Sequence, residues 1–477
     1  MKSTKIARSS LVLIIGQGGG QLLSLIRNAI IGHLLTPEDF GIAATFAITV
    51  SAIEMASDLA VDRLLVQSKK GNDPGFQGAT HLFMLLRGLF GAIIIFIAAP
   101  YVAHYFDLSN EAWVFYWLAL IPLVRGFSHL DVKRFQREMN FKPYILSEFI
   151  PQLITCMAAY PVVIYIQGYS SVMYLTVLQA ILLVLMSHVL AKRKYTINAA
   201  IIYFKDILTF GWPLLINGVL MFFIFQGDKL IIGATFDKAV LGVYSAAFMI
   251  AMMPAMIIIK ALTPLLLSYF SKQQDNYREL MSNYALSAEI VVLIASLYVV
   301  FFVIFGGDVL QIVFGQQYQD QDILVAYISI VWAVRLLRVP PTILAMAKGD
   351  TKVALVANVF RTISLFAVVY VCLNDYSIEY VAIACFIGEF LALFVTIFLV
   401  KIKYNVNMLL SILRLLLFIG TLVVVYYMQH NINLELGVKT GGISTFFICS
   451  VVIFLLFFIF PTKLRRFLFT ANVTGGG

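Results

Sequence analysis

The chain has 477 residues, 61% of them hydrophobic and 12% charged, and its mean hydropathy is +0.92. Soluble domains are about 45–50% apolar, so this composition excludes a soluble enzyme, and the net charge of +9 does not by itself indicate nucleic acid. The apolar residues form segments of about 20, the length with which a helix crosses a hydrocarbon core about 30 Å thick. A membrane barrel would show alternating segments of about 10 residues instead. The sequence therefore predicts an all-α polytopic membrane protein.

Hydropathy predicts about fourteen spans, the first centred near residue 22 and the last near residue 450. Nearly all lysines and arginines of the connecting segments fall on one face, and the opposite face has only Lys238 and Lys439. This asymmetry predicts that both termini are cytoplasmic. The loops are short and no GxxxxGK motif followed by Ser or Thr occurs, which excludes an ATP-driven pump.

The first span contains "GQGGGQLLSLIRN", an unusually polar stretch for a membrane helix. Gly18, Gly19 and Gly20 each weaken the helix by about 1 kcal/mol relative to alanine, which predicts a hinge, with close helix packing as the alternative. Arg27 lies about 12 Å below the outer end of the span, too deep to reach the surface easily. One helical face carries Gln17, Gly20, Gln21, Ser24 and Asn28, with Arg27 at its margin. This face is expected either to line a polar cavity or to hydrogen-bond neighbouring helices.

Other charges also lie inside predicted spans, where each costs about 2.5–3.5 kcal/mol unless it meets a cavity or a partner. Glu54, Asp58 and Asp62 recur at four-residue spacing in the second span, which predicts one acidic helical face. This face either binds a coupling cation or proton, or pairs with nearby arginines. Arg125 and Arg335 lie near mid-depth in the fourth and tenth spans and are predicted to line a cavity.

An internal repeat relates the two halves of the chain. Laid over each other, "RNAIIGHLLTPEDFGIAATF" and "DKLIIGATFDKAVLGVYSAA" match at four positions with a constant offset of 201 residues. Six spans separate the copies, so the repeats are parallel and a transport site is expected between them. The sequence thus predicts a lobe of six helices in residues 1–205, a second in 206–403, and two further helices with a cytoplasmic tail in 404–477.

The repeat places Asp228 and Lys229 at the positions of Arg27 and Asn28. Two interpretations stay open: a salt bridge that locks one conformation, or an anion site with a charge-balancing carboxylate. In the seventh span, Gly211, Pro213 and Gly218 are expected to form a second hinge.

Several short motifs carry a family resemblance: "AIIGHLLTPEDFG" at the end of the first span, "DLAVDRLLVQ" at the end of the second, "FQREMNFKP" after the fourth, and "DKLIIG" with "LGVYSAAF" at the seventh and eighth. The chain resembles the polysaccharide transporter (Wzx-type, colanic-acid-exporter-like) family of the multidrug/oligosaccharidyl-lipid/polysaccharide (MOP) exporter superfamily. The resemblance implies a flippase of undecaprenyl-diphosphate-linked oligosaccharide in the bacterial cytoplasmic (inner) membrane. It also implies relatedness to lipid II flippases and association with other polysaccharide-assembly proteins.

Guanidinium groups give bidentate, charge-assisted hydrogen bonds to phosphate, which suits a diphosphate substrate. No enzyme activity, metal or cofactor is expected, and sodium, protons or the membrane potential are the candidate energy sources. The alternatives are a multidrug or cation antiporter of the same superfamily and, as a different class, a membrane glycan polymerase or ligase. The predicted substrate-binding residues are Arg27, Asn28, Gln17, Gln21, Asp228, Lys229, Arg125 and Arg335, and the coupling candidates are Glu54 and Asp58.

Overall fold

The computed structural model describes residues 2–138, 140–406, 418 and 420, with side chains from Gly16 onward except that of Gln17. Throughout this part of the chain every regular element is a helix. Ten described helices are long and apolar enough to cross a membrane, or eleven if a pair bent by 53° is one span. The protein is therefore a multi-pass membrane protein. The predicted spans centred near 418 and 450 lie almost entirely outside the described residues, so the number fourteen stays a prediction.

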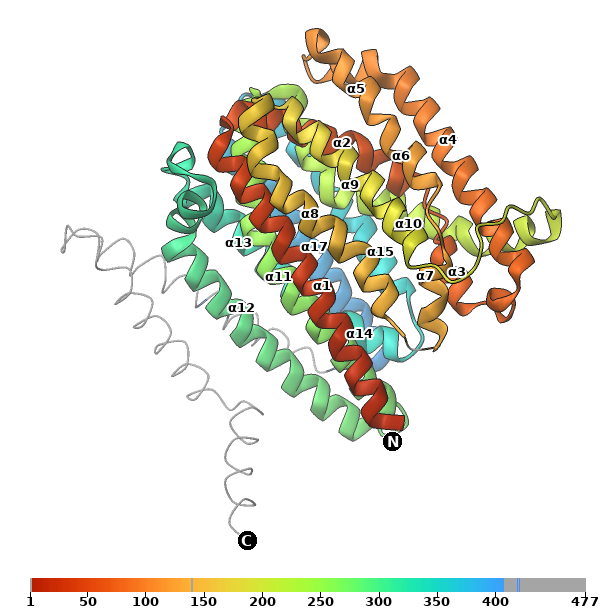
Figure 1. Cartoon of the computed structure of the whole chain (residues 1–477). Helices are drawn as coiled ribbons and strands as arrows, with labels where there is room; N and C mark the ends of the chain where they lie inside the picture. The colour runs from red at the N-terminus through yellow and green to blue at the C-terminus, as the bar shows by residue number, and fades with distance from the viewer. Residues whose placement is uncertain (1, 139, 407–417, 419, 421–477) are drawn as a thin grey trace. The chain divides into compact units, whose positions relative to one another are not determined.

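By packing, the chain divides into two compact units, Met1–Ser245 and Ala246–Gly477. In the first unit, α1 lies along α8, α8 packs against α9, and α4 packs against α5 and α6 (Figure 1). Its main core gathers side chains such as Phe46, Ile95 and Phe115 from α2, α4 and α5. The elements are α1 (Lys2–Leu34), α2 (Pro37–Ala56), α3 (Val61–Gln67), η1 (Lys69–Asn72), α4 (Pro74–Tyr105), η2 (Ser109–Glu111), α5 (Ala112–Leu118), α6 (Leu120–Gly126), α7 (Asp131–Arg134), η3 (Phe135–Glu138), α8 (Lys142–Ile166), α9 (Ser170–Val189), α10 (Ile201–Thr235) and the start of α11 (Lys238–Lys272).

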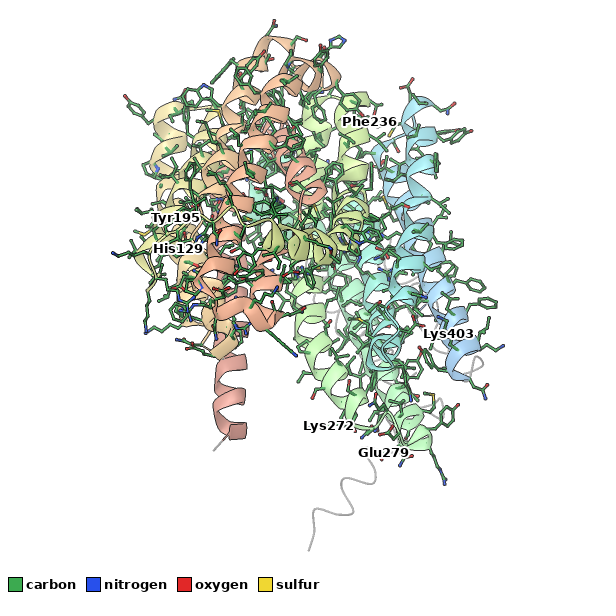
Figure 2. All side chains as sticks on the ribbon, turned by 90° about the vertical axis from the view of Figure 1, so that its right-hand side faces the viewer. His129, Tyr195, Phe236, Lys272, Glu279 and Lys403 are labelled. Atoms are coloured by element: carbon green, nitrogen blue, oxygen red, sulfur yellow. The ribbon has the colours of Figure 1, made fainter. Side chains whose placement is uncertain are left out.

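In the second unit, α12 packs along α13, and α17 packs against α13 and α15. Figure 2 shows Lys272, Glu279 and Lys403 toward the same end of these helices, where the sequence places connecting segments of one membrane face. Besides the rest of α11, the elements are α12 (Tyr277–Phe314), η4 (Gln316–Tyr318), α13 (Asp322–Leu337), α14 (Val339–Ala347), α15 (Lys352–Thr362), α16 (Ser364–Leu373) and α17 (Ile378–Tyr404).

The second predicted span is broken, which corrects one expectation. α2 ends at Ala56 and α3 begins at Val61, and between them Ala60 has a φ of 48° in the left-handed region. The Asp58 carboxylate accepts from the Ala60 N–H at 3.0 Å and stabilises the turn. A single acidic helical face through Glu54, Asp58 and Asp62 is therefore wrong, because four-residue spacing aligns side chains only on a continuous helix.

The repeat is confirmed at the level of helix ends. The offset of 201 residues found in the sequence also separates the ends of α1 and α10, Leu34 and Thr235, and the starts of α2 and α11, Pro37 and Lys238. Within the first unit the two copies touch reciprocally. A β-carbon built on Gly41 would lie 1.7 Å from the Lys238 carbonyl oxygen, and one on Gly242 would lie 1.9 Å from the Pro37 carbonyl oxygen. The symmetry-related contacts indicate a two-fold relation between the repeats at this crossing.

Replacing Gly41 or Gly242 with alanine should lower the free energy of unfolding by similar amounts, about 1–3 kcal/mol, because each methyl group must displace a helix backbone. Thermal unfolding of the purified variants measures the effect. Gly18→Ala and Gly20→Ala are the matched controls, since a β-carbon there has no neighbour within 4 Å, and alanine should leave stability unchanged or raise it by about 1 kcal/mol. A Gly41→Ala variant as stable as Gly20→Ala would contradict the close crossing.

The glycines predicted as hinges lie in uninterrupted helices. α1 continues through Gly18, Gly19 and Gly20, and α10 continues through its inner proline, Pro213. Gly218 serves close packing, because a β-carbon there would lie 2.2 Å from the Met55 carbonyl oxygen of α2. The hinge roles stay predictions.

Gly211 likewise lies directly against Leu59 in the break after α2. Through these contacts α10 packs as part of the first unit, although the sequence assigns this helix to the second repeat. The predicted boundary at residues 205 and 206 remains a prediction about the repeats.

Candidate functional site

A charged cavity of about 470 Å³ lies within the first unit. Residues of α2, α3, α4, α6, α7, α8 and α9 and of the loop before α7 line it, so segments far apart in the sequence form one site. Four acidic and three basic side chains line it: Glu54, Asp58, Asp62, Glu148, Arg87, Arg125 and Lys133. The three acids expected on one helix thus meet in the cavity through the break in that helix.

Arg125 and Glu54 form the central pair of the cavity. The Arg125 guanidinium, at the end of α6, donates through Nη1 to the Glu54 carboxylate of α2. Both side chains are about one-third exposed, at 33% and 29%. The Arg125 Nε is buried and has no hydrogen-bond partner among the described residues. A predicted substrate-binding residue and a predicted coupling residue are therefore bonded to each other.

Arg87 of α4 holds the broken end of α2. Its Nη2 donates to the Glu54 carbonyl oxygen at 2.7 Å and its Nε to the Ser57 hydroxyl at 3.0 Å. Its guanidinium also lies 3.5 Å from the Asp58 carboxylate. Because these bonds satisfy carbonyl and side-chain groups freed by the helix break, Arg87 has a mainly structural place in the cavity wall.

Lys133 of α7 lies between two carboxylates at another side of the cavity. Its Nζ is 3.4 Å from Glu148 and 3.9 Å from Asp62, and it stands 3.8 Å above the Tyr144 ring. Tyr144 and Glu148 lie one turn apart in α8, so this helix supplies both contacts.

The four carboxylates exceed the three basic groups by one negative charge. An anion therefore enters favourably only if a carboxylate is neutralised or moves away. The partly exposed pairs are worth at most about 1 kcal/mol each. Such pairs exchange partners at low energetic cost, which suits a site that must bind and release a charged ligand.

Arg27 contacts neighbouring helices. Its Nη1 donates to the Gln179 amide oxygen of α9 at 2.5 Å, and the Gln179 amide donates to the Gln152 oxygen of α8 at 2.5 Å. This arrangement favours the interhelical alternative for the polar face of α1. Gln21 and Asn28 are half-buried on the same helix, and the side chain of Gln17 lies outside the described residues. The substrate-binding role of these residues stays a prediction.

Asp228 is buried and bound by its own unit. The Tyr244 hydroxyl donates to its Oδ2 at 2.6 Å, and the Lys229 N–H donates to its Oδ1 at 2.8 Å. Since Tyr244 belongs to α11, this bond fixes the end of α10 to the start of the next helix. Lys229 is half-buried beside it.

Arg335 lies in the second unit, in a separate buried cluster. Its Nε donates to the Glu389 carboxylate at 2.8 Å, and Arg361 donates to the same oxygen at 2.7 Å. The Arg335 guanidinium also stacks 4.3 Å from the Trp332 ring centre. The structure thus brings Arg125, Glu54 and Asp58 together in the charged cavity. Three other predicted site residues do not line this cavity and bind other partners: Arg27, Asp228 and Arg335.

Sequence reasoning missed Lys133 and Glu148 as cavity residues, because both fall in or near predicted cytoplasmic segments. The sequence also has six histidines, and the structure brings three of them, His81, His129 and His188, together in the first unit. The local sequence carries no signal for this meeting, since the three residues come from different elements.

The family model for polysaccharide biosynthesis proteins matches residues 30–322, more than half of the chain. The chain belongs to this family. A comparison of this polysaccharide biosynthesis protein with curated protein sequences found no match. Its fold is similar to that of a multidrug resistance MATE family transporter of the MOP superfamily in an inward-facing conformation, with a TM-score of 0.67 and 15% identity over 81% of this chain and 94% of that one.

The lipid II flippase MurJ in an inward closed conformation is also similar, with a TM-score of 0.64 and 14% identity over 94% of this chain and 98% of that one. At these identities the likeness shows a shared fold. The predicted family is therefore confirmed, and the fold is the one that these MOP-superfamily transporter and lipid II flippase structures share, as predicted.

Proposed function

We propose that this polysaccharide biosynthesis protein is a flippase that moves undecaprenyl-diphosphate-linked oligosaccharide across the bacterial cytoplasmic membrane by alternating access. The observation that carries the proposal is the charged cavity, which is lined by Arg125, whose guanidinium is a group that binds phosphate through paired hydrogen bonds. Family membership and the fold shared with a lipid II flippase support it. With both termini cytoplasmic, as the positive-inside distribution predicts, the cavity lies toward the cytoplasmic half.

In this proposal the cavity binds the diphosphate and the proximal sugars while the polyprenyl chain stays in lipid. Glu54 competes with the diphosphate for Arg125, because both present oxygen anions to the same guanidinium. A proton or sodium ion taken up by Glu54 or Asp58 cancels part of the excess negative charge and frees Arg125. Substrate binding and ion uptake are then coupled through one ion pair.

The second candidate function is an antiporter for cationic drugs. The excess of carboxylates in the cavity favours it, because a cation would pair with Glu54 or Asp58 directly. Charge replacement separates the two functions. Neutralising Arg125 should impair a flippase and leave a cation antiporter active, whereas neutralising Glu54 should impair the antiporter.

Disruption of the gene, followed by analysis of lipid-linked oligosaccharides, tests the proposal. We expect a completed oligosaccharide unit to accumulate on its lipid carrier at the cytoplasmic leaflet, because assembly continues while export stops. Drug sensitivity without such accumulation would support the antiporter instead. Purified protein that elongated or transferred glycan chains would indicate an enzyme and contradict both transport proposals.

A further inference from the structure

Three histidines and one tyrosine gather in the first unit, beside the connector of residues 190–200 between α9 and α10. The ring centres of His81 and His129 are 4.8 Å apart, and those of His129 and His188 are 5.1 Å apart. Tyr195 of the connector stacks on His81 at 4.3 Å. Figure 2 shows His129 and Tyr195 side by side. We call His81, His129, His188 and Tyr195 the histidine clasp.

His81, from the start of α4, is fully buried and binds the connector. Its Nδ1 lies 3.0 Å from the Thr196 carbonyl oxygen, and the Leu130 N–H donates to its Nε2 at 3.2 Å. A carbonyl oxygen only accepts, so Nδ1 must carry the hydrogen, and Nε2 must keep a free lone pair. The two bonds therefore require a neutral ring in one tautomer.

His129, in the loop before α7, follows the same pattern with the nitrogens exchanged. Its Nε2 lies 3.0 Å from the Arg193 carbonyl oxygen of the connector, and the Asp131 N–H donates to its Nδ1 at 3.2 Å. This ring is 2% exposed and also belongs to the wall of the charged cavity. His129 thus joins the cavity to the connector.

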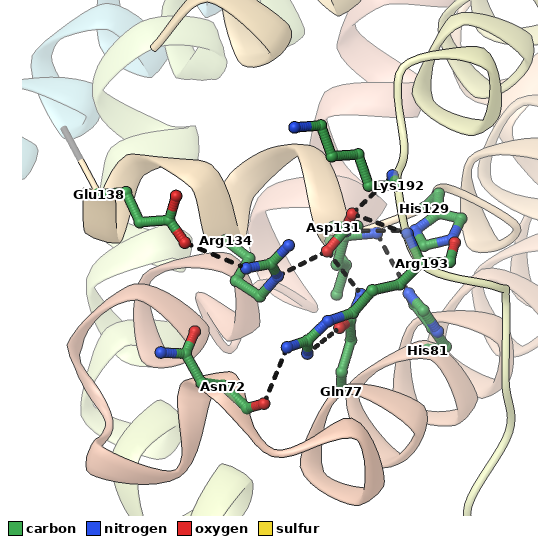
Figure 3. A network of polar contacts seen from close by, with 10 residues as sticks. Asn72, Gln77, His81, His129, Asp131, Arg134, Glu138, Lys192 and Arg193 are labelled. Atoms are coloured by element: carbon green, nitrogen blue, oxygen red, sulfur yellow. Dashed lines mark hydrogen bonds and ion pairs between the residues drawn. The ribbon is translucent and has the colours of Figure 1, made fainter. Parts of the chain in front are cut away.

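Charged groups complete the attachment of the connector (Figure 3). The Asp131 carboxylate accepts from the Lys192 N–H at 2.8 Å, from the Arg193 N–H at 3.2 Å, and from the Arg134 Nε at 2.6 Å. The Arg193 guanidinium donates to the Gln77 amide oxygen at 3.0 Å. The titratable or charged groups that face the two buried rings are His188, Tyr195, Asp131, Arg134, Lys192 and Arg193.

We propose that the histidine clasp is a proton-sensitive latch, in which proton uptake by His81 or His129 releases the connector that joins the two repeats. Protonation turns the accepting nitrogen into a donor, so that it faces a backbone N–H across 3.2 Å and the bond becomes repulsive. This step rests on the proposed alternating-access cycle: if the two repeats rock against each other, the chain between them must move or strain, so a released connector favours the transition. The latch needs no particular substrate.

The direction of the pH response follows from the hydrogen bonds of the two rings. A neutral ring makes both of its bonds, whereas a protonated ring loses the bond from the backbone N–H. A released histidine has a pKa of about 6.5, so the neutral, latched form predominates near pH 7. The latch then weakens as the pH falls, because only acid forces a proton onto the ring.

Hydrogen exchange measured by mass spectrometry on the full chain, without substrate, tests the latch between about pH 5 and 8. After correction for intrinsic exchange, the peptide covering residues 190–200 should lose protection about tenfold on acidification. His129→Phe and His81→Phe keep an aromatic ring but cannot titrate, so they should exchange fast at every pH.

Tyr195→Phe is the matched control, because the Tyr195 hydroxyl is buried with no hydrogen-bond partner in the described part of the chain. It should keep the pH response of the original protein. If the phenylalanine variants fail to fold, the pH titration of the unmodified chain still decides. Connector protection that stays constant over this pH range while the helices remain protected would overturn the latch, as would an unchanged pH response in the double variant His81→Phe with His129→Phe.

Discussion

Replacing Arg125 with alanine is expected to reduce flipping of lipid-linked oligosaccharide about ten- to hundredfold, the loss expected for one charge-assisted hydrogen bond to a ligand. The reason is the position of Arg125 in the cavity, where the only hydrogen-bonded partner of its side chain in the described part of the chain is the Glu54 carboxylate. Transport is measured with the purified protein in vesicles, by the appearance of labelled lipid-linked oligosaccharide in the opposite leaflet. Arg125→Lys should restore only part of the activity, because an ammonium lacks the bidentate fork.

The double variant Arg125→Ala with Glu54→Gln separates binding from structure. It removes the carboxylate that Arg125→Ala alone leaves without its partner, so it should restore stability but not transport. Glu54→Gln alone should keep transport and lose its dependence on protons or sodium. Lys70→Ala is the control, since Lys70 pairs with Asp206 at 2.7 Å on the exposed surface. Full activity in the double variant would show that Arg125 serves only to neutralise Glu54.

Removing the Glu389 carboxylate should lower the free energy of unfolding by about 3–5 kcal/mol, the cost of leaving buried charge without its counter-ion. Glu389 is 1% exposed and accepts from both Arg335 and Arg361. Glu389→Gln is the appropriate change, because the amide keeps the volume and removes the charge. Chemical or thermal unfolding of the purified protein measures the loss.

The cluster also predicts a ranking. Arg335→Met should cost less than Glu389→Gln, because Arg361 still neutralises the carboxylate when Arg335 is absent. Lys403→Gln breaks a more exposed pair with Asp350 in the same unit and should change stability by at most about 1 kcal/mol. If Glu389→Gln were as stable as the unmodified protein, the cluster would not be a buried ion pair. If Arg335→Met folded but did not transport, the predicted substrate role of Arg335 would gain support.

Local patterns were enough to predict the fold class. Hydropathy depends on the length and composition of each segment, so the membrane helices could be read without knowledge of their neighbours. The repeat could be read as well, because the helix ends at Leu34 and Thr235 keep the spacing of the matching letters. In the structure, the matching glycines Gly41 and Gly242 of the two repeats both lie at the crossing where the repeats touch.

The candidate site could be predicted only in part. Arg125, Glu54 and Asp58 were identified from the cost of a charge in a membrane helix, and the structure places all three in one cavity. The arrangement assumed for the acids was wrong, since no glycine or proline marks the break between Ser57 and Ala60. The side chain that binds the freed end of α2 is Arg87, which comes from another helix.

The sequence by itself therefore determined the membrane fold, the family, the repeat and the charged side chains that must be explained. Only the tertiary structure decided which of these charges meet, that Arg125 faces Glu54, that Arg335 faces Glu389, and that His81 and His129 hold the connector. The physical reason is the distance along the chain between the residues that determine each feature. Hydropathy and repeat spacing are properties of neighbouring residues, whereas an ion pair or a hydrogen bond is made within a few ångströms between residues that the chain separates widely.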